Sequence, residues 1–316
     1  MNLLPVEPAH RLVDQPEERR WLVEGLWAED AVGIVGGEPK CCKSFLALDL
    51  AVAVASGAPC LRQYPVPRPG RVLLYAAEDA LHLVRRRLDG ICHAAGVALA
   101  DLDVQVITAP TLRLDHAADR DRLDATVAAL RPRLLVLDPF VRLHRIDENV
   151  SGEVAPLLAY LRELQRRYQI GVVVVHHARK GAARARAGQA LRGSSEFHAW
   201  GDSNLYIRRI GDQLSLTVEQ RAAVSTAGIS LALESEGDAL ALRVTHRQAN
   251  ADATSARPCA EDRVVRALTE ATTPLSVAEL RRSCRIRTAT LCEILAHLVS
   301  VGRVRRSPAG YRLRSE

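Results

Sequence analysis

The chain has 316 residues, of which 48% are hydrophobic and 25% charged, and its formal net charge at pH 7 is +6. This composition excludes a disordered polymer and suffices for one large core and a small second one. No stretch approaches the roughly 20 apolar residues that cross a bilayer, and the N-terminus does not resemble a signal peptide, so we expect a cytoplasmic protein without a membrane partner. The seven cysteines show no C-x-x-C spacing, which argues against a zinc site or a disulfide framework.

Residues 1–30 give a weak signal at the start of the chain. Trp21, Leu22, Leu26 and Trp27 have a spacing that is compatible with a helix and lead into the first apolar run. We interpret residues 1–30 as an N-terminal arm that acts as a lid or packs on the core.

Residues 36–44 form a candidate phosphate-binding loop. They follow an apolar run at 31–35 and precede an amphipathic run at 45–55, which is the strand, loop and helix context of such a loop. Of only three lysines in the chain, Lys40 and Lys43 lie in this segment, and lysine places a compact charge on a phosphate. We expect Lys43 to reach the β and γ oxygens and the Ser44 hydroxyl to hold Mg²⁺. The predicted nucleotide contacts are Gly37, Glu38, Pro39, Lys40, Cys41, Cys42, Lys43, Ser44 and Phe45.

One residue departs from the G-x-x-x-x-G-K-[ST] pattern. Counted from Gly37, Cys42 stands where the second glycine is expected. The backbone room that glycine provides beside a phosphate is therefore reduced. A thiol at a helix N-terminus beside phosphates should have a lowered pKa, so we expect its alkylation or oxidation to block nucleotide binding. The alternative for the whole segment is a glycine-rich turn that only joins a strand to a helix.

Short apolar runs alternate with helical patterns from residue 31 to about 210, which predicts βαβ units and a parallel sheet. The run at 170–176 has no polar alternation, as expected of a central strand covered on both faces. Three later runs alternate polar and apolar residues and predict an antiparallel extension. The predicted strands are 32–36, 71–76, 104–108, 133–138, 170–176, 203–209, 213–220, 228–235 and 239–246.

Polar side chains follow three of these strands. Asp138 ends one buried run, Glu78 lies just past the end of another, and His176 and His177 end a third. The carboxyl ends of parallel strands meet at one edge of a sheet, so these side chains should converge with the loop. Asp138 would complete the Mg²⁺ site, Glu78 would polarise the attacking water, and a polar residue of the third strand could contact the γ-phosphate. Taken singly, each also fits a helix cap, a surface charge or a structural histidine.

The last sixty residues form a different kind of unit. Residues 248–258 are small and polar and predict a linker. Within 259–316 the pattern of three short helices and an arginine-rich hairpin looks like a winged helix-turn-helix. From Arg257 onward there are twelve arginines and six acidic residues, so the net charge of the chain is concentrated here. This charge favours DNA over a docked protein, and the predicted DNA contacts are Arg285, Arg287, Arg305 and Arg306.

The motifs taken together resemble the RepA-like branch of the RecA-type AAA-family ATPases, which is typified by ring-shaped plasmid replicative helicases. The resemblance covers roughly residues 20–245. The motifs are the loop at 36–44, Tyr-Ala-Ala-Glu-Asp at 75–79, Leu-Val-Leu-Asp-Pro-Phe-Val-Arg-Leu-His at 135–144, His-His-Ala-Arg-Lys at 176–180 and the segment 191–202.

The resemblance implies an α/β fold with a RecA-like P-loop core at 31–247 that hydrolyses ATP with Mg²⁺, and assembly into a hexameric ring. It also implies an arginine finger near the end of strand 203–209, either Arg208, which we favour, or Arg209. The other implied roles are phosphate and Mg²⁺ binding for Lys43 and Ser44, catalytic base for Glu78, Walker B acid for Asp138 and sensor for His177.

Segments 139–152 and 178–194 follow strands and should point to the same face, where in a ring both could line the pore and hold nucleic-acid phosphates. Arg179 and Lys180 are the candidate DNA contacts. A flexible, solvated loop is the alternative. Three functions remain open: a helicase or translocase in replication or recombination, a nucleotide-controlled DNA-binding switch, and an ATPase that remodels a protein docked by the tail.

Overall fold

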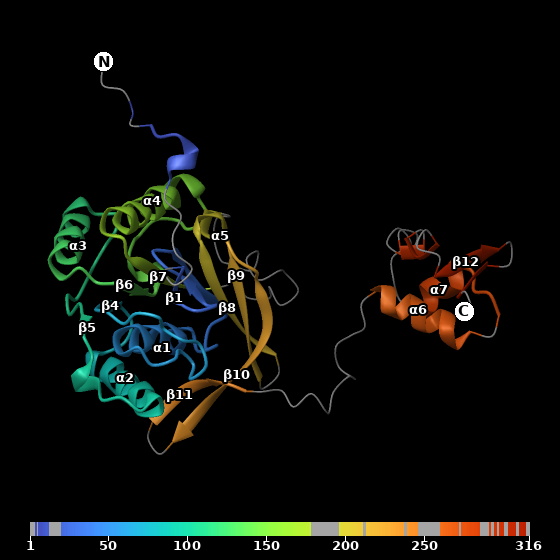
Figure 1. Ribbon diagram of the computed structural model, residues 1–316, viewed down its shortest axis with the longest axis horizontal. Helices are drawn as coiled ribbons and strands as arrows, with labels where there is room; N and C mark the ends of the chain where they lie inside the picture. The colour runs from blue at the N-terminus through green and yellow to red at the C-terminus, as the bar shows by residue number, and fades with distance from the viewer. Residues whose placement is uncertain are drawn as a thin grey trace. The chain divides into compact units, whose positions relative to one another are not determined.

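The structure is a computed structural model, and it divides the chain into two compact units, Met1–Arg247 and Gln248–Glu316 (Figure 1). Four of the predicted DNA contacts, Arg179, Lys180, Arg285 and Arg287, lie outside the described residues, as does the predicted linker. The described residues are 4, 6–12, 20–177, 196–210, 213–236, 239–245, 260–271, 273–284, 291, 294–295, 297–299, 303–307 and 310–313.

A nine-stranded sheet runs through the first unit in the order β11-β10-β9-β8-β3-β7-β6-β4-β5. Strands β8, β3, β7, β6, β4 and β5 are parallel, whereas β9, β10 and β11 extend the sheet in antiparallel fashion. The predicted parallel core and antiparallel extension are confirmed. The strands are β3 (Val32–Gly37), β4 (Val72–Ala76), β5 (Val104–Val106), β6 (Leu134–Asp138), β7 (Gly171–His177), β8 (Ser203–Ile210), β9 (Gln213–Gln220), β10 (Thr226–Glu236) and β11 (Ala239–Val244).

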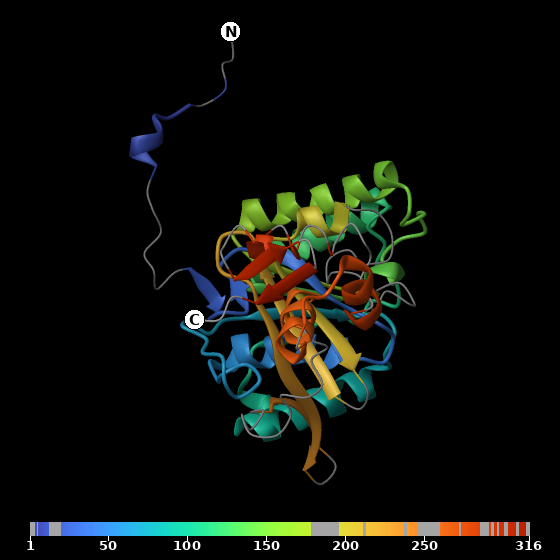
Figure 2. The same cartoon turned by 90° about the vertical axis from the view of Figure 1, so that its right-hand side faces the viewer.

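Helices cover both faces of this sheet, so that α2 and α4 lie on opposite sides of it (Figures 1 and 2). Successive strand residues point to opposite faces, and in β7 Val173 and Val175 join one hydrophobic cluster while Val172 and Val174 join the other. This burial confirms β7 as a central strand. The helices of the first cluster are α1 (Lys43–Ser56) and α2 (Leu81–Ala95); those of the second are α3 (Ala117–Leu130), α4 (Ser151–Tyr168) and α5 (Glu196–Trp200).

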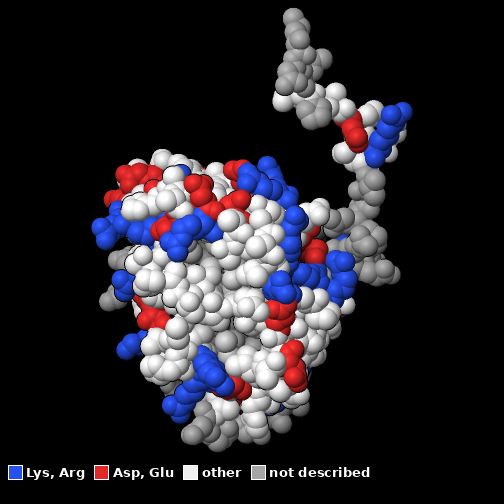
Figure 3. Space-filling view, turned by 90° about the vertical axis from the view of Figure 1, so that its left-hand side faces the viewer, with Lys and Arg blue, Asp and Glu red and all other residues white. Residues whose placement is uncertain are grey.

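The face that carries α2, α3 and β5 has charged side chains at its rim and a largely uncharged centre (Figure 3). The sheet ends there with β5, a strand of three residues whose Gln105 is exposed. A short edge strand limits edge-to-edge pairing with other sheets. None of the helices in the described ranges combines the length and the apolar character needed to cross a membrane.

The helical interpretation of residues 21–27 is wrong. They form a hairpin of β1 (Trp21–Val23) and β2 (Trp27–Ala28), with Gly25 in the turn at φ +71. Trp27 is fully buried, and its indole N–H donates to the Ala31 carbonyl at 3.2 Å. This segment therefore belongs to the core. Ahead of it, a short 3-10 helix, η1 (Ala9–Arg11), has no buried residue.

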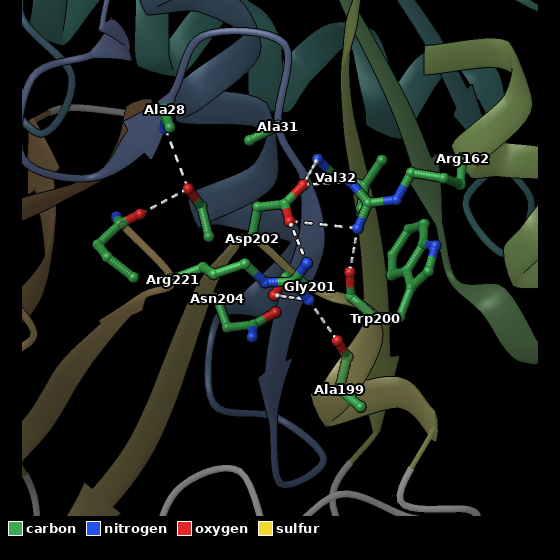
Figure 4. Close-up of polar contacts among 12 residues, drawn as sticks. Ala28, Ala31, Val32, Arg162, Ala199, Trp200, Gly201, Asp202, Asn204 and Arg221 are labelled. Carbon is green, nitrogen blue, oxygen red and sulfur yellow. Dashed lines mark hydrogen bonds and ion pairs between the residues drawn. The ribbon is translucent and has the colours of Figure 1, made fainter. Parts of the chain in front are cut away.

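Side chains join β8 to β3 at the end of the sheet opposite the phosphate loop (Figure 4). Asn204 Oδ1 accepts from the Ile34 amide at 3.1 Å, and Asp202 Oδ2 accepts from the Val32 amide at 3.3 Å. Asp202 also forms ion pairs with Arg162 of α4 and Arg221, the latter at 3.2 Å. These contacts fix the start of β8 against β3 and α4. Arg208 and Arg209 lie near the other end of β8.

The second unit has its own hydrophobic core, built from residues such as Val264, Leu268 and Leu280. Helix α6 (Ala260–Glu270) and helix α7 (Val277–Cys284) precede further helical residues at 291, 294–295 and 297–299 and the hairpin of β12 (Val304–Ser307) and β13 (Gly310–Leu313). Ser276 is the N-cap of α7: the Ser276 amide donates to Glu279 Oε2 at 2.8 Å, and the Glu279 amide donates to Ser276 Oγ at 3.3 Å. Assignment of this unit as a winged helix-turn-helix stays a prediction.

Candidate active site

The phosphate loop connects β3 to α1, which begins at Lys43. Gly37 is required by close approach to β8, because a Cβ there would lie 2.3 Å from the Ile207 carbonyl oxygen. Cys42 has φ 67 and ψ 26, the left-handed conformation that glycine adopts without strain. Residue 42 thus has the backbone conformation of the expected glycine although it carries a side chain.

Lys43 is 5% exposed, and its ammonium donates to the Glu38 carbonyl oxygen at 2.7 Å. Burial lowers the pKa of Lys43, while Cys41 and Asp138 oppose this shift. The loop therefore holds the Lys43 ammonium in place. When nucleotide binds, a phosphate oxygen would replace the Glu38 carbonyl oxygen as the hydrogen-bond acceptor of this ammonium.

Asp138 ends β6 beside this loop and is 8% exposed. Burial raises the pKa of Asp138 to about 6, aided by Asp79 and Glu78 and opposed by a hydrogen bond with Ser44 and by the charge of Lys43. A buried carboxylate next to a hydroxyl provides the oxygen ligands that Mg²⁺ prefers. The residues present therefore fit a magnesium ion, which would compensate the charge that Asp138 acquires in a poorly solvated place.

A cavity of about 370 Å³ brings these groups together. All predicted site residues from Lys40 to Phe45 line it, together with Glu78, Asp138 and His177 from three strand ends. Gly37, Glu38 and Pro39 belong to the same loop but are not among the lining residues. The convergence predicted for the carboxyl edge of the sheet is thus found among the described residues.

Three further residues line the cavity that were not predicted from the sequence: Asp79, Arg87 and Val175. Arg87 of α2 forms an ion pair with Asp79, and its guanidinium carbon lies 5.3 Å from the centroid of the Phe45 ring. Asp79 could have been found beside Glu78, whereas Arg87 has no local motif because it reaches the site only through helix packing. Arg142 was also missed: its Nε donates to Glu78 Oε1 at 2.8 Å.

Arg208 and Arg209 lie on opposite faces of β8 because side chains alternate along a strand. Arg209 is exposed, and its Nη2 lies 3.5 Å from the carbonyl oxygen of Lys40 in the loop of its own chain. Arg208 is half-buried on the face that carries Tyr206. The assignment of Arg208 as the finger stays a prediction.

The prediction of a lowered thiol pKa at Cys42 is wrong. Burial raises the pKa of Cys42, although Arg209 and Lys43 oppose the shift. Burial likewise raises the pKa of Cys41. Loss of solvation outweighs the nearby cations, so the basis for a reactive thiol in this loop disappears.

A strand, a loop with a buried lysine, and a helix that starts opposite a buried aspartate define a P-loop ATPase. Residues 2–183 match the family model described as an AAA domain. The chain therefore belongs to this AAA-domain family. The match includes Lys43, Glu78, Asp138 and His177 and ends before α5 and the antiparallel extension.

Proposed function

We propose that this AAA-family ATPase is an ATP-driven motor that acts on DNA, of the ring-forming, RepA-like helicase or translocase type. The observation that carries the proposal is the single cavity in which the phosphate loop meets Glu78, Asp138 and His177. Nucleotide binding requires only the loop, whereas hydrolysis also requires a carboxylate that can accept a proton from water.

The roles follow from position. The loop amides and Lys43 bind the phosphates, with the Lys43 ammonium exchanging the Glu38 carbonyl for a phosphate oxygen. Ser44 and Asp138 would hold Mg²⁺, which when bound neutralises charge on the phosphate oxygens. Glu78 is 42% exposed, so water can reach it as a general base, and His177 lines the cavity where a γ-phosphate would lie.

Action on DNA is supported by the charge of the second unit and by its elements. The hairpin that follows its helices places Arg305 on the surface and Arg306 next to it in β12. Helices followed by a basic hairpin fit a winged helix that reads DNA or binds its phosphates. Ring assembly rests on the resemblance and on the proposed finger, Arg208.

The second candidate is a DNA-binding switch with slow hydrolysis. It is favoured by the hydrogen bond from Arg142, which occupies an oxygen of the proposed base Glu78. A third candidate, remodelling of a docked protein, would leave the second unit without salt-dependent DNA binding.

The test measures ATP turnover with and without single-stranded DNA over a range of protein concentrations. We expect Lys43→Ala and Glu78→Gln each to lower turnover at least about a hundredfold, because they remove the phosphate charge and the general base. Glu24→Gln is the matched control, since Glu24 is exposed and is not among the residues that line the cavity. Unchanged turnover in both site variants would contradict the proposal, and a forked-duplex unwinding assay separates the motor from the switch.

A further inference from the structure

The contact between Arg142 and Glu78 joins the segments that follow two neighbouring strands. Arg142 closes the 3-10 turn η4 (Phe140–Arg142), which follows β6 after Pro139, and Glu78 follows β4. The guanidinium Nε donates to Glu78 Oε1 at 2.8 Å. The role inferred for this contact rests on the proposed function, in which Glu78 activates water.

The backbone that carries Arg142 is firmly held. Phe140 and Leu143, on either side of it, are fully buried. The Phe140 ring packs edge-on against Phe197 of α5, with centroids 5.2 Å apart, and the Leu143 carbonyl accepts from the Leu114 amide at 2.6 Å. The Arg142 side chain is nevertheless 60% exposed. The position of the Arg142 backbone is therefore fixed by the buried turn, while its guanidinium is accessible to solvent and to other anions.

This pair restrains a general base by occupying it. The hydrogen bond from Arg142 uses one of the two carboxylate oxygens of Glu78 that could accept the proton of the attacking water. An ion pair this exposed is weak and screened by salt, so it holds Glu78 at rest and yields to a stronger anionic partner.

The sequence that follows β7 indicates which anion competes. Strand β7 lies beside β6 in parallel, so the chain leaves both strands at the same edge of the sheet. The sequence after β7, residues 178–195, contains five basic and no acidic side chains. Such a segment attracts the phosphodiester backbone of nucleic acid, and arginine binds phosphate through two parallel hydrogen bonds.

We propose that Arg142 is a positioning residue that restrains Glu78 in the resting protein and releases it when a nucleic-acid phosphate binds the Arg142 guanidinium. Hydrolysis is thereby coupled to nucleic acid through one side chain. The turn that carries Arg142 directly follows the strand of Asp138, so the residue that senses the polymer lies beside the nucleotide site and contacts one of its lining residues, Glu78.

The test measures kcat and KM for ATP in the full chain, with and without a single-stranded oligothymidine, for the wild type, Arg142→Ala and Arg142→Lys. In Arg142→Ala we expect basal kcat to rise by up to about fivefold, the factor expected for an exposed ion pair, with KM unchanged. Stimulation by the oligonucleotide should fall by the same factor. Arg142→Lys, which keeps a cation near Glu78, should stay close to the wild type.

Two controls make the result specific. Arg145→Ala removes the same charge from the same exposed segment and leaves the Arg142–Glu78 pair in place, so its basal kcat should not change. In the double variant Arg142→Ala with Glu78→Gln, the rise in basal kcat should disappear, because the released group is no longer a base.

Equal basal kcat and equal stimulation in Arg142→Ala and Arg145→Ala would overturn the proposal, as would a lower basal kcat in Arg142→Ala. These outcomes differ from failure of the proposed function, in which the wild type itself shows no turnover that depends on Lys43.

Discussion

Cys42 shows how one residue can depart from a motif without changing the loop. Its left-handed backbone, with φ 67, is the conformation that the usual glycine adopts. In a β-carbon-bearing residue this conformation costs roughly 1–2 kcal/mol. The loop therefore keeps its shape with cysteine in place of the expected glycine, and the backbone at Cys42 is strained as a result.

The strain at Cys42 is measurable with a matched pair of variants. Cys42→Gly and Cys42→Ala both remove the thiol, but only glycine relieves the left-handed strain. We expect Cys42→Gly to be more stable than Cys42→Ala by about 1 kcal/mol in urea unfolding. Equal stability of the two variants would show that the backbone at residue 42 is unstrained.

Asp138 should make stability depend on pH in the absence of nucleotide. Its folded pKa of about 6 lies above the ordinary value of 3.8, so the folded state binds the proton more tightly. The stabilisation is fully present below about pH 4 and is lost as pH rises through 6, which amounts to roughly 3 kcal/mol. Asp138→Asn should lack this loss, so the variant should gain stability relative to the wild type between pH 4 and 7. Parallel curves in pH-dependent urea unfolding would contradict the assignment.

At the scale of elements, hydrophobic periodicity predicted all nine strands of the sheet with bounds within two residues of those observed. Periodicity failed at residues 21–27, because apolar residues spaced one, four and five apart fit a helix face as well as a tight hairpin. Gly25 in the turn and the packing of Trp27 against Gly33 favour the hairpin. A Cβ added at Gly33 would lie 3.0 Å from the Trp27 ring, so only glycine allows this close packing. These contacts join residues that no local pattern connects.

The contacts of Asp202 between β3 and the start of β8 can be tested by mutation. Asp202→Ala would leave Arg162 and the Val32 amide without their carboxylate, so we expect a loss of about 2–3 kcal/mol in free energy of unfolding. Glu163→Ala is the control on the same helix as Arg162, because its pair with Arg167 is exposed and should contribute about 1 kcal/mol or less. Comparable losses in the two variants would mean that Asp202 is only another surface charge.

At the scale of the whole molecule, the proposed finger requires a second copy of the chain. Arg208→Ala should retain nucleotide binding but lose ATP turnover, because the charge it supplies would act at the neighbouring site. Mixing Arg208→Ala with Lys43→Ala should restore part of the turnover, since each chain provides what the other lacks. Arg209→Ala is the comparison, because Arg209 lies near the loop of its own chain. A mixture that stays inactive would argue against an interface site.

The sequence by itself determined the strand pattern, the phosphate loop and the acids at strand ends. Hydrophobic periodicity, a glycine-containing loop motif and a polar residue after an apolar run can each be recognised within a few consecutive residues. Only the tertiary structure decided that Leu22, Leu26 and Trp27 belong to the core and that burial raises the pKa of Cys42. It also decided that Arg87 lines the nucleotide site and that Arg142 contacts Glu78. Each of these depends on groups distant in the chain: solvation and ion pairing are set by packing, which no short segment encodes alone.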